Sequence, residues 1–145
     1  MNKLIHIAAV SLLLLAPALQ AKLTTAKIFS NHMVIQRDLA SPVWGWDDPG
    51  KEITVSFAGQ DHKTTADKNG RWQIKLSPLA ANATAQAMTI SNTTGEKISY
   101  HDILIGDVWI CSGQSNMEWS VKQSHNPQQE IAQANHPLIR LFDVS

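Results

Sequence analysis

Apolar and polar residues alternate with a period of two over much of the first hundred positions. Residues 53–57 place Ile, Val and Phe at every second position, and residues 72–76 repeat this with Trp, Ile and Leu. This spacing is typical of a β-strand with one buried face. Turn-forming residues separate the runs at intervals of about ten residues, so about six or seven short strands are expected. The clearest of these strands are expected at 43–46, 53–57, 62–66, 72–76, 88–90 and 98–100.

The turns between these runs indicate an antiparallel arrangement. Asn69-Gly70 separates two of the strands, and this pair supplies the positive φ angles that a hairpin turn requires. Residues 78–86 are mostly small and are expected to form a loop. We therefore expect an antiparallel β-sandwich over residues 22–104, within a mainly β chain.

The pattern changes after Tyr100. Residues 103–110 form a nearly continuous apolar run, which is typical of a strand covered on both faces. Asn126 and Pro127 resemble a helix cap and first helical residue, so a helix is expected to reach about Asn135, with Ile131 and Ala134 facing inward. Residues 138–144 are expected to form a second strand. Strand, helix and strand predict the truncated start of a parallel α/β domain over 105–145. The alternative is an appendage of the sandwich.

The first 21 residues match a secretory signal peptide. Lys3 precedes an apolar run over residues 7–16, which is shorter than the roughly 20 residues of a membrane span. Small residues follow, so cleavage is expected after Ala21, with Ala18 as the alternative. We expect a periplasmic or secreted protein without a membrane span after cleavage.

Composition excludes several classes of function. The 145-residue chain has 12 basic and 12 acidic residues, which argues against nucleic-acid binding. Its single cysteine excludes an internal disulfide framework and multi-cysteine metal sites. Cys111 lies in an apolar run and is expected to be buried and inert. No metal cluster, phosphate loop or dinucleotide motif is present, so no metal or cofactor is expected.

The most informative polar segment follows the apolar run at 103–110. A serine in a tight turn between a strand and a helix is a suitable place for an activated nucleophile. Ser115 fits this description, with Ser112 as a rival, and Gly113 allows the backbone to turn closely. The elbow motif G-x-S-x-G is not matched, because Met117 occupies the position of its second glycine.

The stretch from Gly106 to Trp119 closely resembles the first motif of the sialate O-acetylesterase family, which belongs to the SGNH (GDSL-like) hydrolases. The resemblance implies that Ser115 is the nucleophile and that its own amide contributes to the oxyanion hole. It further implies that Gly113, Gln114 and Asn116 frame the site. Four upstream stretches resemble the N-terminal β-domain of this family, namely 29–37, 42–46, 49–50 and 70–72.

The same resemblance implies residues that this chain does not supply. SGNH enzymes take the base histidine, an aspartate three residues before it, and further oxyanion donors from later motifs. Here, His101 is adjacent to Asp102 in an extended segment, which is a poor geometry for a base and its orienting group. His125 and His136 flank the expected helix and are expected to be solvated, and His32 has no assigned role. The chain therefore resembles an incomplete N-terminal portion, inactive alone.

The expected function is the hydrolysis of acetyl esters on a carbohydrate by a serine nucleophile. The resemblance favours an O-acetylated sialic acid as substrate, with acetylated xylan or another glycan as the alternative. A different class is a secreted, non-catalytic carbohydrate-binding β-sandwich, because aromatic faces suit sugar rings. Trp72 is expected in the core, whereas one of Trp44 and Trp46 is expected to be exposed.

Overall fold

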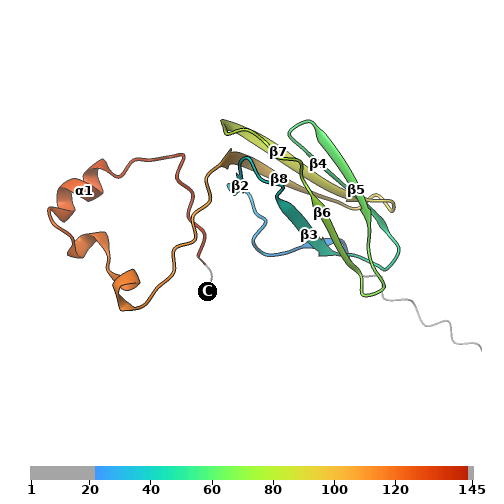
Figure 1. Ribbon diagram of the computed structural model, residues 1–145, viewed down its shortest axis with the longest axis horizontal. Coiled ribbons are helices and arrows are strands. Elements are labelled where there is room, and N and C mark those ends of the chain that lie inside the picture. Colours follow the sequence, from blue (N-terminus) through green and yellow to red (C-terminus); the bar gives the residue numbers. More distant parts are fainter. Residues whose placement is uncertain (1–21, 144–145) are drawn as a thin grey trace, which may run out of the picture.

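The computed structural model describes residues 22–143, so the expected signal peptide lies outside the described residues. Eight strands form two facing sheets, and the chain then continues into a separate segment with short helices (Figure 1). The elements are β1 (Thr24–Thr25), β2 (Val34–Gln36), β3 (Pro42–Trp46), β4 (Glu52–Phe57), β5 (Gln60–Thr65), β6 (Arg71–Lys75), β7 (Asn82–Asn92), β8 (Lys97–Gly106), η1 (Ser115–Glu118), η2 (Val121–Gln123) and α1 (Pro127–Gln133).

The two sheets confirm the mainly β prediction. One has five strands in the order β2-β8-β7-β4-β5, and the other has three in the order β1-β3-β6. All pairs are antiparallel except β2 and β8, which run parallel with Ile35 opposite Ile105. The antiparallel prediction is therefore wrong for this pair. The chain passes through β3 to β7 between β2 and β8, and such a long connection permits parallel pairing.

The core lies between the two sheets and follows the period-two pattern. Alternate residues of β4 are buried, as are Trp72, Ile74 and Leu76. The prediction that Trp72 belongs to the core is confirmed. The buried cluster contains Leu23, Phe29, Ile35, Val43, Ile53, Val55, Phe57, Ala66, Trp72, Ile74, Leu76, Met88, Ile90, Ile103 and Ile105.

Gly45 is the point of closest packing in the small sheet. A Cβ at this position would lie 1.9 Å from the carbonyl oxygen of Thr24 and 2.7 Å from Cζ2 of Trp72. The absence of a side chain therefore lets β1 and the Trp72 ring approach β3. On the outer face of β3, Trp44 packs edge-on against Phe29, whereas Trp46 is 45% exposed. The expectation that one of these two tryptophans is exposed is confirmed.

Two local predictions need correction. Gly70 has the positive φ angle expected of a turn, but β5 and β6 belong to different sheets, so the turn is a crossing between layers and not a hairpin. The predicted loop over 78–86 ends early, because β7 begins at Asn82. The first half of β7 is largely exposed, and its backbone pairs with β8 through an irregular register. A strand with few buried side chains leaves no apolar periodicity in the sequence.

The segment after Gly106 differs most from expectation. β8 ends at Gly106, and the structure contains no strand over residues 107–143, so the strands predicted to reach Ile110 and to begin at Leu138 are wrong. Ile110 is 92% exposed and Leu141 is 94% exposed. Parallel strands form where both faces are covered. Within the described residues nothing covers these side chains, which explains the missing strands.

The helix forms near its predicted position but without the predicted packing. α1 begins at Pro127, as expected. Asn126 precedes it in a left-handed conformation and makes no side-chain capping hydrogen bond; its carbonyl oxygen instead accepts from the amides of Gln129 and Glu130. Ile131 and Ala134 are both exposed and do not face inward, because only the short helix η2 lies against α1 among the described residues, and it does not cover them.

Candidate functional site

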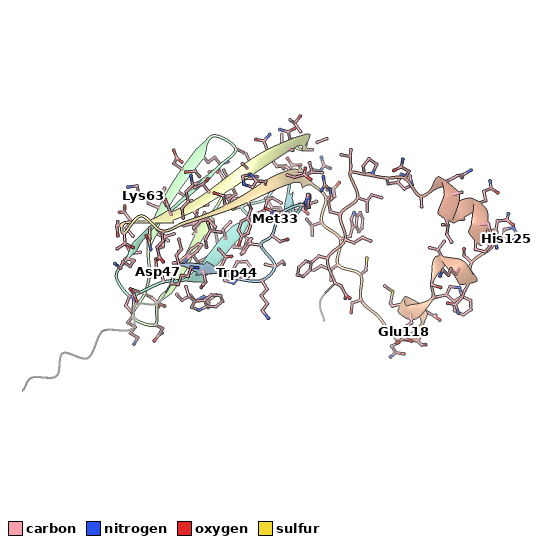
Figure 2. All side chains as sticks on the ribbon, turned by 180° about the vertical axis from the view of Figure 1, so that it is seen from behind. Met33, Trp44, Asp47, Lys63, Glu118 and His125 are labelled. Carbon is pink, nitrogen blue, oxygen red and sulfur yellow. The ribbon has the colours of Figure 1, made fainter. Side chains whose placement is uncertain are left out.

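Ser115 lies at the start of a tight turn in the segment that follows the sandwich. It is the first residue of η1, and Gln114 precedes it in an extended conformation. The amide of Met117 donates a 2.8 Å hydrogen bond to the carbonyl oxygen of Gln114, which closes the turn. Figure 2 shows Glu118, at the end of η1, at the lower edge of the segment and away from the sandwich. Ser115 itself is exposed to solvent.

Gly113 is constrained by the side chain of Met117. A Cβ on Gly113 would lie 2.7 Å from Cγ of Met117, so the glycine leaves room for this methionine to fold back over the turn. Met117 stands where the elbow motif G-x-S-x-G has its second glycine. The turn is therefore built differently, with the methionine packed on the first glycine.

The other expected site residues share the exposure of Ser115. Ser112, Gln114 and Asn116 are all exposed, and Asn116 accepts a hydrogen bond from the amide of Trp119 through its backbone carbonyl. Among the described residues, the hydroxyl of Ser115 makes no hydrogen bond to a histidine. The part of the chain described here therefore brings the nucleophile candidate and its framing residues together, without a base.

The histidines lie elsewhere and are arranged in an unexpected way. His101, His125 and His136 are exposed. The carboxylate of Asp102 pairs not with its neighbour His101 but with His32, at 2.6 Å between Nδ1 and Oδ2. Sequence reasoning left His32 without a role. The partners are 70 positions apart, and no local pattern signals such a contact.

Arg140 completes a cluster with these two residues. Its Nη1 lies 2.7 Å from Oδ2 of Asp102, and its Nη2 lies 3.2 Å from Oδ1, so the guanidinium binds the carboxylate at two points. We call His32, Asp102 and Arg140 the return cluster, because Arg140 lies where the segment comes back to the sandwich. Sequence reasoning missed it entirely.

The return cluster changes the acidity of Asp102. The hydrogen bond from Arg140, followed by that from His32, lowers the pKa of Asp102 from 3.8 to about 2. The charged carboxylate is therefore favoured in the folded state.

This pKa shift predicts a pH-dependent difference between the wild type and Asp102→Asn. A depressed pKa adds stability that is present above the ordinary aspartate pKa and is lost as the pH falls through about 2. Urea unfolding of both proteins between about pH 5 and pH 2 should show the wild type more stable at the upper end. The difference should shrink steadily toward the lower end. A difference that stays constant over this range would contradict the assignment.

A second cluster holds the chain where it leaves β8. Nε of Arg37 donates a 2.9 Å hydrogen bond to Oδ1 of Asp107, and the side-chain oxygen of Gln36 accepts one of 2.8 Å from the amide of Val108. The amide of Arg37 also donates to the carbonyl oxygen of Gly106 at 2.9 Å. We call Gln36, Arg37 and Asp107 the entry cluster. It fixes the direction in which the segment leaves the sandwich.

Cys111 is exposed, so the expectation of a buried cysteine is wrong. The reason is the early end of β8, which leaves the apolar residues after it uncovered. Over residues 22–143, no group of three or more metal-ligating side chains gathers in one place. Within the same residues, no helix has the length and apolar character needed to span a bilayer.

Comparison with known proteins relates the chain to carbohydrate esterases. No protein-family model matches it. It is 35% identical over 130 residues to sialate O-acetylesterase of Mus musculus and 36% identical over 132 residues to that of Homo sapiens. The matches cover 83% of this chain but only 24% and 25% of those proteins. The chain therefore spans about a quarter of the length of these relatives.

A solved structure extends the relationship to bacteria. A carbohydrate acetylesterase from Xanthomonas citri superposes with a TM-score of 0.72 at 36% sequence identity. The superposition covers 79% of this chain and 26% of that one. The fold and the sequence thus agree on the same group of proteins.

Proposed function

The chain belongs to the sialate O-acetylesterase-like family, and on this premise we propose that it is part of a carbohydrate O-acetylesterase with Ser115 as the nucleophile. The observation that carries the proposal is the exposed turn at Ser115, in the segment that follows the last strand of a chain similar in fold to a carbohydrate acetylesterase. Gly113, Gln114 and Asn116 frame this serine in the proposed site.

The proposed chemistry proceeds in two steps. Oγ of Ser115 attacks the acetyl carbonyl carbon and its proton passes to a base, while the amide of Ser115 donates to the developing oxyanion. The sugar oxygen then leaves with a proton, and an acetyl-serine remains. Water hydrolyses this ester to acetate and regenerates the serine. The base and the remaining oxyanion donors are proposed to come from polypeptide outside this chain.

Exposed apolar side chains support the proposal that further polypeptide completes the site. The segment after Gly106 exposes several large ones, which soluble proteins rarely leave uncovered in such number. We propose that, in a longer protein, the remainder of an SGNH domain covers them. They are Val108, Trp109, Ile110, Met117, Trp119, Val121, Ile131, Leu138, Ile139, Leu141 and Phe142.

The proposed substrate is an O-acetylated sialic acid. The mouse and human relatives are named sialate O-acetylesterases, and the Xanthomonas citri protein is described as a carbohydrate acetylesterase. Acetylated xylan or another glycan is the alternative substrate. Parallel assays of the longer protein on acetylated sialic acid and acetylated xylan distinguish the two. Absence of turnover on both, and on an aryl acetate, would favour a non-catalytic glycan-binding module.

The chain alone is expected to fold through the sandwich but to show no turnover above background. A serine hydroxyl is a weak nucleophile until a base takes its proton, and the described residues place no histidine in contact with Ser115. The measurement is hydrolysis of an aryl acetate by residues 22–145, beside the Ser115→Ala variant of the same chain. A clear rate that disappears in this variant would show that one of the chain's own histidines acts as the base.

A further inference from the structure

The segment that carries Ser115 is held to the sandwich at both of its ends. The entry cluster joins Asp107 and Val108 to Arg37 and Gln36. The return cluster joins Arg140 to Asp102 and His32. Between these points, over residues 109–139, the hydrogen bonds of the described chain stay within the segment itself. The two clusters therefore determine where the segment lies relative to the sandwich.

Both clusters are built on one pair of strands. β2 and β8 run parallel, with Val34 opposite Leu104 and Gln36 opposite Gly106. His32 and Arg37 lie on either side of β2, while Asp102 lies within β8 and Asp107 directly follows its last residue. Each cluster thus bridges the same two stretches of backbone. A segment fastened at two points along one strand pair has much less freedom than one fastened at a single point.

Backbone conformation and burial, in addition to the ion pairs, distinguish the return cluster from an ordinary surface contact. His32 and Asp102 both have left-handed backbone conformations, with φ of 65° and 54°, which residues other than glycine seldom adopt. Such conformations persist where surrounding interactions hold them, and they concentrate at functional positions. Arg140 is only 20% exposed, and its Nε is buried without a partner. The guanidinium is held through its terminal nitrogens, by the two-point contact with the carboxylate of Asp102 and by a 3.2 Å contact between Nη1 and Nδ1 of His32.

We propose that Arg140 is a positioning residue: through Asp102 it holds the Ser115 segment in a fixed position against the sandwich. The catalytic consequence of this role rests on the proposed function, whereas the structural role does not. The two-point contact uses both terminal nitrogens of the guanidinium. Lysine offers a single ammonium group and reproduces this geometry only in part.

The native Cys111 provides a direct test of position. It is exposed and lies between the two clusters along the chain, so in the Lys63→Cys variant a nitroxide on each of the two cysteines reports the distance from the segment to β5. Figure 2 shows Lys63 on the sandwich, away from the segment. The pulsed electron–electron distance distribution of the full chain should be narrow. In Arg140→Gln it should broaden by about twofold or more, with an intermediate width in Arg140→Lys.

A matched control separates loss of the cluster from loss of positive charge. Arg71 is an exposed arginine on β6, and Arg71→Gln should leave the distribution unchanged. Thermal unfolding followed by far-ultraviolet circular dichroism should show the sandwich transition intact in all variants. Equal widths in the wild type and Arg140→Gln would overturn the proposal. Loss of the sandwich transition in Arg140→Gln would also overturn it, because Arg140 would then stabilise the sandwich itself.

The catalytic consequence is measured separately, as kcat and KM of the longer protein. Misplacing a nucleophile lowers kcat more than it changes the binding of a small ester, so Arg140→Gln should reduce kcat on an aryl acetate by about 10- to 100-fold with little change in KM. Arg140→Lys should recover part of the loss. An unchanged kcat would overturn the catalytic part of the proposal. A wild type without turnover contradicts the proposed function, while the distance measurement still decides the structural role.

Discussion

Ser115→Ala is expected to reduce hydrolysis of acetyl esters by the longer protein by about 10⁴-fold or more, because a nucleophile and its base act as a unit. What remains after such a change comes from substrate binding and the oxyanion hole. The reason for choosing Ser115 is structural as well as motif-based. Ser115 is the first residue of η1, and among the described residues its amide donates no hydrogen bond to a preceding carbonyl oxygen. This amide is therefore available to an oxyanion. Initial rates on an aryl acetate measure the effect.

Ser112→Ala is the matched control for this change. Ser112 is exposed and lies three residues before Ser115, ahead of the glycine that shapes the turn. It should retain most of the activity, since it is neither the proposed nucleophile nor a framing residue. Loss of turnover in Ser112→Ala, with activity kept in Ser115→Ala, would reverse the assignment of the nucleophile.

Gly45→Ala is expected to lower the free energy of unfolding of the sandwich by about 3 kcal/mol. The added methyl carbon would lie 1.9 Å from the backbone oxygen of Thr24, and no rotation of a side chain relieves a contact with backbone. β1 must therefore move away from β3. That movement also disturbs Leu23, which is buried beside it. Urea unfolding followed by circular dichroism gives the change in midpoint.

Gly106→Ala is the control for the Gly45 prediction. Gly106 ends β8, and a Cβ there would meet only Cγ1 of Val34, at an ordinary contact distance of 3.6 Å. Its unfolding free energy should change by less than about 1 kcal/mol. If Gly45→Ala lowered the free energy of unfolding as little as Gly106→Ala does, the prediction would be contradicted, and β1 would contribute little to the stability of the sandwich.

The sequence predicted the strands better than it predicted their partners. Period-two alternation identifies which side chains of 53–57 and 72–76 face the core, and these residues are buried. The same pattern carries no information about which strand lies alongside. β5 and β6 therefore looked like a hairpin although they belong to different sheets, and the parallel pairing of β2 with β8 went unseen.

The candidate site shows the same division between local and distant information. Ser115 and Gly113 are found through a contiguous motif and lie together in one turn. The return cluster draws on residues 32, 102 and 140, and only the folded chain brings these together. The apolar run at 103–110 predicted one long strand, but a strand also needs covering layers, and β8 stops at Gly106 where the described residues no longer supply them.

The parallel pairing of β2 with β8 has a consequence for the order of folding. These strands are 70 residues apart along the chain, so their contact closes a long loop and carries a high entropic cost. Contacts of this kind slow folding and form late. During synthesis, the five-stranded sheet gains its β2 edge only after Gly106 has emerged. Residues 107–143 follow at once, and both clusters that hold them depend on that edge. Assembly of the candidate site is thus coupled to completion of the sandwich.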